Sequence, residues 1–191
     1  MADLLELQSV RARLGQYFDK SSSIRDQSLL GAMCHALSEA HQGTVSTIDV
    51  AVVADEITVT DDGPGLAIDT VAGQIGAEEV MSVLGACGRH KPDAQYASVL
   101  CDVSMAAVNA ISTSASIVTM LDGVAHAQRY ALGVPTAPFK IVDRALPGTR
   151  VRFTLDKRWV GRVPFDLRAV EKHVGTLGLN LENTTIRFTS Q

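Results

Sequence analysis

Two ionisable side chains have the spacing that proton-transfer chemistry needs. His35 and Glu39 are four residues apart in the stretch SLLGAMCHALSEAHQG, residues 28–43, so on a helix they lie one turn apart on one face. A carboxylate can orient an imidazole, and imidazole exchanges protons near neutral pH. The pair therefore predicts a general acid or base. The alternative is a buried histidine beside a cavity that has no catalytic use.

Asp61 supplies a further carboxylate, in the segment DDGPG. Taken alone, this segment is typical of a turn that ends a strand, because glycine adopts the positive φ that such turns require. No His, Cys, Asp or Glu set has convincing metal-ligand spacing, since His35 and Glu39 offer two ligands and no third is identifiable. We therefore expect neither a metal nor a cofactor.

Composition is that of a compact globular protein. The 191 residues are 46% hydrophobic and contain no low-complexity segment, which suffices for one domain with a real core. The net charge of −4 leaves no basic surface for a phosphate backbone, so no nucleic-acid partner is expected. The N-terminus is no secretory signal, and the apolar stretch near residues 99–120 is too polar for a membrane span.

Cysteine usage points to a reducing compartment. Three cysteines without framework spacing fit a cytoplasmic protein better than a disulfide-bonded one. Cys34, beside the predicted His35 stripe, is expected to pack as a small hydrophobic residue.

Periodicity predicts that helices mostly come first and that a meander of strands follows. The predicted helices span 4–14, 26–41, 77–86, 98–112 and 165–178. The predicted strands span 46–53, 57–60, 115–123, 124–132, 137–143, 148–155 and 184–190. This order predicts an α+β architecture with helices packed on one face of a mainly antiparallel sheet.

Five segments occur in the order and approximate spacing of one known family: VTDDGPGL, AEEVMSVLGACGR, MAAVNAIS, ALGVPTAPF and GTRVRF. With them the chain resembles the ATP-binding domain of the DNA gyrase B protein, in the GHKL superfamily of Bergerat-fold ATPases. The resemblance runs over nearly the whole chain and implies a two-layer α/β sandwich as a single domain over residues 1–191. The second domain of gyrase B is expected to be absent, so topoisomerase activity is not expected.

The resemblance implies that one half of the pocket is retained. Asp61 falls where the family's aspartate accepts a hydrogen bond from the adenine amino group, with Gly65 beside it and Thr149 supporting the same edge. Apolar residues are expected to form the floor of this pocket: Ala32, Ala36, Val59, Leu66, Met81 and Val151.

The other half of the pocket departs from the family pattern. Gly31 and His35 stand where gyrase B has its water-activating glutamate and its magnesium-binding asparagine, and neither can do that work. The segment YASVLCDVS, residues 96–104, stands where the glycine-rich phosphate loop is expected and has no glycine. ATP hydrolysis is therefore not expected.

The resemblance makes the helix stripe of Gly31, His35 and Glu39 face the same cavity as Asp61. We predict that Gly31 vacates volume there and that His35, Glu39 and Asp61 form the catalytic set. The predicted ligand is a small organic molecule, which the protein binds and, in the catalytic interpretation, converts by isomerisation or cyclisation. Two alternatives stay open: a non-catalytic regulator or inhibitor-binding decoy, with a homodimer or protein partner, and an adenine-nucleotide binder.

Overall fold

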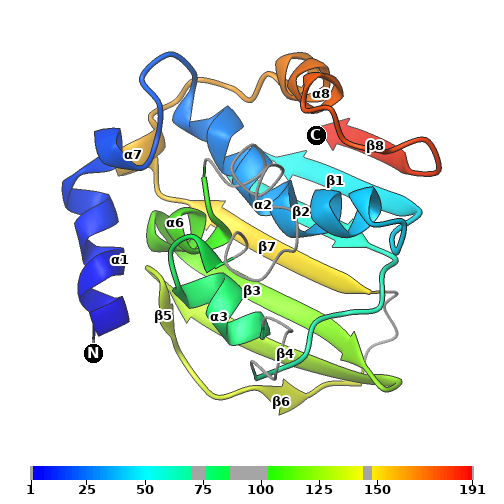
Figure 1. Ribbon diagram of the computed structural model, residues 1–191. Helices are drawn as coiled ribbons and strands as arrows, with labels where there is room; N and C mark the ends of the chain where they lie inside the picture. The colour runs from blue at the N-terminus through cyan, green and yellow to red at the C-terminus, as the bar shows by residue number, and fades with distance from the viewer. Residues whose placement is uncertain (1, 70–75, 87–102, 144–147, 191) are drawn as a thin grey trace.

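The computed structural model describes residues 2–69, 76–86, 103–143 and 148–190, with side chains from residue 6. Six α-helices and eight strands are described, with a short 3-10 helix at Leu14–Gln16 (Figure 1). The helices are α1 Ala2–Ala12, α2 Ile24–His41, α3 Ala77–Ser82, α6 Met105–Ala110, α7 Lys157–Val160 and α8 Leu167–Thr176. The strands are β1 Thr47–Val53, β2 Glu56–Asp61, β3 Ser112–Leu121, β4 Val124–Ala131, β5 Val134–Pro135, β6 Lys140–Ile141, β7 Thr149–Leu155 and β8 Thr185–Ser190.

The strands form one sheet in the order β5-β4-β3-β7-β2-β1-β8, with β6 paired to β4. All described pairs are antiparallel except β1 with β8, which is parallel. Helices α2, α3 and α6 lie over one face of this sheet (Figure 1). The predicted α+β architecture is confirmed. No helix in the described ranges has the length and apolar character needed to span a bilayer.

Three details differ from the sequence prediction. Strand β5 and helix α7 were not predicted, because elements of two and four residues carry no periodicity. Helix α6 begins at Met105, where Ser104 caps it by accepting a hydrogen bond from the Ala107 N–H. The first part of the predicted helix over 98–112 lies in residues 87–102, outside the described ranges, as does most of the segment YASVLCDVS.

Helix α2 is the central element of the helical layer. Ser23 caps its N-terminus by accepting a hydrogen bond from the Arg25 N–H at 3.2 Å. Most residues between Arg25 and Ala40 are buried, because the sheet lies on one side of the helix and other helices cover the rest. Because α2 is buried on nearly all sides, its polar residues lie inside the protein together with its apolar ones, and His35 is one of them.

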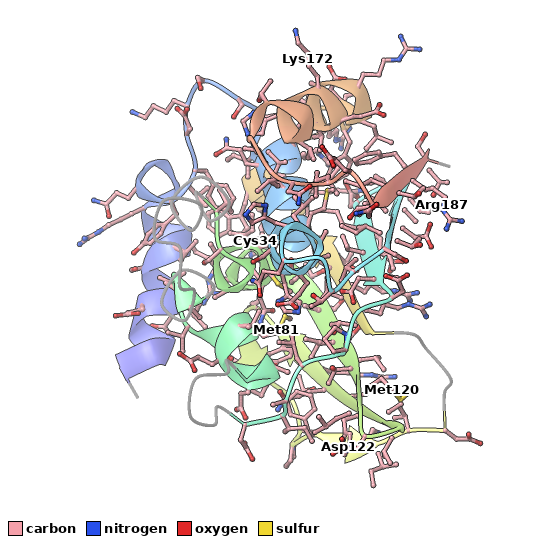
Figure 2. All side chains as sticks on the ribbon, turned by 45° about the vertical axis from the view of Figure 1, so that its right-hand side comes forward. Cys34, Met81, Met120, Asp122, Lys172 and Arg187 are labelled. Atoms are coloured by element: carbon pink, nitrogen blue, oxygen red, sulfur yellow. The ribbon has the colours of Figure 1, made fainter. Side chains whose placement is uncertain are left out.

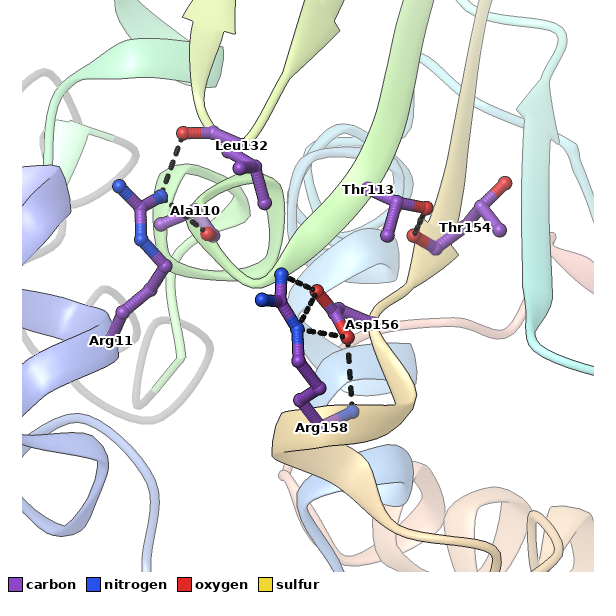
Figure 3. A network of polar contacts seen from close by, with 7 residues as sticks. All are labelled: Arg11, Ala110, Thr113, Leu132, Thr154, Asp156 and Arg158. Carbon is purple, nitrogen blue, oxygen red and sulfur yellow. Dashed lines mark hydrogen bonds and ion pairs between the residues drawn. The ribbon is translucent and has the colours of Figure 1, made fainter.

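Two arginine contacts fix the elements at this end of the sheet (Figure 3). Arg11 ties α1 to backbone carbonyl groups, and Arg158 pairs with the residue that caps α7 after β7. Arg11 Nη1 donates to the carbonyl oxygens of Ala110, at 3.0 Å, and Leu132, at 2.8 Å. Asp156 caps α7 by accepting from the Arg158 N–H at 2.9 Å, and its carboxylate also pairs with the Arg158 guanidinium. These contacts hold α1 and α7 beside the end of the sheet.

A buried ion pair links the start of α2 to the turn between β1 and β2. Arg25 is 4% exposed, and its Nη2 lies 2.5 Å from Asp55 Oδ1 and 2.7 Å from the Gly161 carbonyl oxygen. Lys157 also contacts Asp55, at 3.0 Å. The guanidinium lies 5.3 Å from the centre of the Phe165 ring, which adds a cation–π contact.

We predict that Arg25→Ala lowers the free energy of unfolding by about 3 kcal/mol, because it leaves the Gly161 carbonyl without this donor and leaves the partly buried Asp55 carboxylate with the exposed Lys157 in place of a buried partner. The matched control is Arg187→Ala, which removes an ion pair with Asp49 whose two side chains are both more than half exposed. Exposed pairs contribute little, so the control should unfold like the wild type in urea. Equal losses in the two variants would contradict the prediction.

Candidate functional site

Asp61, at the end of β2, joins three segments through one carboxylate oxygen. Asp61 is 5% exposed, and its Oδ1 accepts hydrogen bonds from the Gly63 N–H and the Thr149 N–H, both at 3.0 Å. Thr149 begins β7, which pairs with β2 in antiparallel register. The structure therefore brings Asp61 and Thr149 together, as the sequence predicts.

Glycine is required where the chain approaches this carboxylate. Gly148 has φ +56°, and a Cβ there would lie 2.3 Å from Asp61 Oδ1. Gly65 has φ +82°, and a Cβ there would lie 1.8 Å from the carbonyl oxygen of Met120, near the far end of β3 (Figure 2). Both positions need a conformation that side chains rarely adopt. Gly148 is a site residue that the sequence analysis missed, although its place directly before Thr149 signals it.

The loop after DDGPG is tied to β3 by a threonine that the sequence analysis also missed. Thr119 Oγ1 accepts from the Leu66 N–H at 2.6 Å and donates to the Leu66 carbonyl oxygen at 3.1 Å. Thr119 is also the register partner of Thr149 across β3 and β7. The sequence marks Thr119 only as an inward-facing residue of a strand whose buried and exposed positions alternate.

Asp61 and Thr149, at the adjoining ends of β2 and β7, form what we call the Asp61 wall. Two of its polar atoms have no protein partner among the described residues. Both hydrogen bonds to Asp61 fall on Oδ1, which leaves Oδ2 open. Thr149 is 2% exposed, and its buried Oγ1 has no hydrogen-bond partner. A buried hydroxyl without a partner costs about 1–3 kcal/mol, so such groups are rare unless a ligand or water binds them. The wall can therefore accept from and donate to a bound molecule.

Burial raises the pKa of Asp61 from its ordinary value of 3.8 to about 6. The hydrogen bonds from Thr149 and Gly63 lower the pKa but do not offset the burial. The charges of Glu39 and Asp62 raise the pKa further. The carboxyl of Asp61 therefore carries a proton in part of the molecules near neutral pH, which is the property of a useful acid or base.

Helix α2 contributes the two other predicted catalytic residues. His35 is 8% exposed, and Glu39, one turn on, is half-buried. Glu39 Oε2 accepts from Thr44 Oγ1 at 2.7 Å. The charge of Glu39 raises the pKa of Asp61, so Glu39 lies close enough to the end of β2 to act on this carboxyl. Cys34 lies in the core on the same helix (Figure 2), as predicted.

Gly31 does not vacate volume, which corrects the sequence prediction. A Cβ on Gly31 would lie 2.8 Å from the Val103 carbonyl oxygen and 2.9 Å from Val108 Cγ2. The chain before α6 has closed onto α2 where a side chain would stand. The missing side chain therefore permits close contact of α2 with Val103 and α6, and no space is left where the Cβ of a side chain would stand.

The six residues predicted as an apolar pocket floor are all buried in the main core. Their exposed fractions are 5% or less: Ala32, Ala36, Val59, Leu66, Met81 and Val151. Val59 and Val151 face each other across β2 and β7. The Met81 carbonyl oxygen accepts from Asn109 Nδ2 at 2.9 Å, which fixes α3 against α6 (Figure 2 labels Met81). These residues support the wall that carries Asp61.

Described residues also form two cavities away from Asp61. One, of about 750 Å³, lies between α3, β4 and the chain around β5 and β6. The other, of about 590 Å³, lies between the loop before α2, one flank of α2, and α8. Gly31 lines the second cavity, whereas His35, Glu39 and Asp61 line neither. Within the described ranges, no three His, Cys, Asp or Glu side chains are grouped to hold a metal ion.

Comparison with known proteins relates the chain to type II topoisomerases. It is 31% identical over 97% of its length to the DNA gyrase B protein of Streptococcus pneumoniae, of which it spans 30%. It is 33% identical over 69% of its length to the DNA gyrase B protein of Streptomyces niveus, which is described as novobiocin-resistant and of which it spans 20%. The chain thus covers less than a third of these relatives. No family profile matches it.

The fold is similar to that of a solved topoisomerase IV ATP-binding domain from Francisella tularensis, in complex with a small molecule inhibitor. The TM-score is 0.75 at 22% identity, and the similarity covers 96% of this chain and 50% of that one. At this identity the comparison establishes the shared fold.

We predict that Gly31→Ala destabilises the protein by about 1–3 kcal/mol, because the added methyl group overpacks against the Val103 backbone. Gly175→Ala in α8 is the matched control, since a Cβ there meets nothing within 4 Å. The control should gain about 0.5–1 kcal/mol from helix propensity. Thermal unfolding of both variants tests this, and a stabilised Gly31→Ala would show that the close contact does not exist.

We predict that the Asp61 carboxyl makes the protein less stable as pH rises. Between about pH 4 and pH 6 the folded state holds a proton that the unfolded chain has released, so the free energy of unfolding falls as the pH rises through this range. The shift from 3.8 to about 6 corresponds to about 3 kcal/mol. Asp61→Asn keeps an acceptor for both backbone donors and should be more stable than the wild type at pH 7 but not at pH 4. A pH-independent difference would refute this.

Proposed function

Since this chain is a divergent gyrase-B-like domain with the GHKL fold, we propose that it binds a small organic molecule at Asp61 and Thr149 without hydrolysing ATP. We further propose that it transfers a proton on that molecule. The observations that carry the proposal are the buried Oγ1 of Thr149, which has no hydrogen-bond partner among the described residues, and Asp61 Oδ2, on which no described hydrogen bond falls. The proposal places the protein in the cytoplasm and requires no nucleic acid, membrane or partner chain.

The open atoms define the chemistry of the ligand. Asp61 Oδ2 accepts from a ligand N–H or O–H, and Thr149 Oγ1 pairs with the neighbouring ligand atom. An amide, a lactam or an amino-substituted heterocycle presents such a pair of groups on one edge. A hydrogen bond to a charged carboxylate contributes about 1.5–3 kcal/mol, enough to orient a ligand whose remaining surface is apolar.

Residues beside the wall argue against ATP hydrolysis. Gly31 has no group to activate water. A Cβ at this position would lie only 2.8 Å from the Val103 carbonyl oxygen, so the site has no room for a catalytic side chain. His35 is a poor ligand for magnesium. Related proteins support an organic ligand: the Francisella tularensis domain was solved with a small molecule inhibitor, and the Streptomyces niveus gyrase is described as novobiocin-resistant.

Proton transfer follows from the raised pKa of Asp61. A carboxyl with a pKa of about 6 can take a proton from one ligand atom and return it to another. Isomerisation and cyclisation by this route need no oxidant, metal or cofactor. His35, on the facing helix, is the second candidate to exchange a proton with the ligand.

The test is native mass spectrometry of the purified protein, which should show a bound organic molecule in the wild type. We predict that Asp61→Asn loses this molecule and that Asp62→Asn keeps it. Asp62 is the matched control because it is the adjacent acid, and its carboxylate instead accepts from the Ser46 and Thr47 N–H groups. Loss in both variants, or retention in both, would overturn the assignment of the site.

Calorimetry and product analysis separate the alternatives. ATP with magnesium should give no phosphate, and adenine binding that depends on Asp61 would favour a nucleotide binder instead. If the ligand is a substrate, His35→Gln should retain binding and convert it at least about tenfold more slowly, as expected for loss of an acid or base. Unchanged conversion by His35→Gln would show that His35 is not the acid or base, and a ligand that the wild type binds but does not convert would favour a non-catalytic binding protein.

A further inference from the structure

We propose that the cavity of about 590 Å³ beside α2 is a second binding site, which takes an organic cation: a protonated amine on an apolar body. It lies between the loop before α2, one flank of α2, and α8, which crosses α2 (Figure 1). It is independent of the site at Asp61, because neither Asp61 nor Thr149 lines it.

The wall of this cavity is held in place by a buried glutamine. Gln27 is 7% exposed, and its Nε2 donates to the carbonyl oxygens of Asp19, at 2.8 Å, and Ser22, at 3.0 Å. Its Oε1 accepts from the Asp19 N–H at 2.6 Å. The loop before α2 is thus fixed to the helix by three hydrogen bonds, so the space enclosed between them is a stable feature of the fold.

One flank of α2 lines the cavity with Asp26, Gln27, Leu30, Gly31 and Leu37. His35 and Glu39, which follow Gly31 at intervals of one turn, do not line it. A ligand in the cavity therefore contacts α2 without displacing anything bound at Asp61.

The charge of the cavity selects its ligand. The described residues that line it include Asp19, Asp26 and one histidine, His173, but no Lys or Arg. Asp26 is half-buried, and its Oδ1 accepts one hydrogen bond, from the Asp166 N–H at 2.9 Å. Burial raises the pKa of Asp26 and the charge of Asp166 raises it further, while the hydrogen bond from the Asp166 N–H and the charge of Arg25 lower it. A half-buried carboxylate that lines the cavity attracts a cation.

The rest of the cavity suits an apolar body of drug-like size. Leu30, Leu37, Val103 and Leu177 supply apolar walls, and Phe18 and Tyr17 add aromatic rings. The volume lies within the range of about 300–1,000 Å³ that is typical of small-molecule sites. The arrangement of one charged contact and an apolar surround matches an amine carried on an aromatic or aliphatic skeleton.

Tryptamine and two near-isosteres test the charge preference by calorimetry at pH 7.5. Tryptamine should bind at least about tenfold more tightly than the neutral tryptophol, the ratio expected for one charge-assisted contact. Indole-3-propionate, which carries a negative charge, should not bind. Equal affinities of tryptamine and tryptophol would overturn the proposal, since they would show that no carboxylate contacts the amine.

Substitutions locate the site. Asp26→Asn should reduce tryptamine affinity to that of tryptophol, while Asp166→Asn should not, because Asp166 carries the same charge nearby but does not line the cavity. Ala169→Phe, at an exposed lining position of α8, should block all binding without altering Asp26. Asp61→Asn should leave tryptamine binding unchanged. Tight tryptamine binding by both Asp26→Asn and Ala169→Phe, or its loss in Asp61→Asn, would place the amine elsewhere.

Discussion

The site depends on one carboxylate oxygen, Asp61 Oδ1, which accepts from two backbone donors of different segments. These bonds fix where β2 ends, how the DDGPG turn leaves it and where β7 begins. Gly148 must be glycine because the chain passes so close to that oxygen. Burying a carboxyl with a pKa of about 6 costs stability at neutral pH. The fold therefore carries an ionisable group that an amide could replace structurally, which is typical of a residue kept for a ligand.

The sequence was most informative where local pattern and turn chemistry agree. The hairpin of β1 and β2 followed from alternation and a tight turn, and α2 from helical spacing. Asp61 and Thr149 were found because both lie in motifs of a recognisable family. Thr119 carried no such signal, since its role arises from register across β3 and β7, which joins residues far apart in the chain. The parallel pairing of β1 with β8 was missed for the same reason.

Gly31 shows why a missing side chain was misread as empty space. Reading a glycine in place of a larger residue as empty space assumes that the neighbouring residues stay in place. In a folded protein the neighbours pack into the space instead. Here the chain around Val103 approaches α2. The cavity that does border α2 lies on its flank, where Asp26 and Leu30 are ordinary helix residues. No motif marks it, because it is formed by the way α8 and the preceding loop pack.

The strands at Asp61 and helix α2 are under different physical constraints. The ends of β2 and β7 are held by backbone hydrogen bonds and glycines, so their geometry cannot drift without breaking the pairing of the two strands. Helix α2 is held by side-chain packing, which is close at Gly31. The presence of Asp61 and Thr149 is therefore in part structural and does not by itself identify a ligand. The buried Thr149 Oγ1 has no hydrogen-bond partner among the described residues, and no described hydrogen bond falls on Asp61 Oδ2; together they are the reason to expect a ligand.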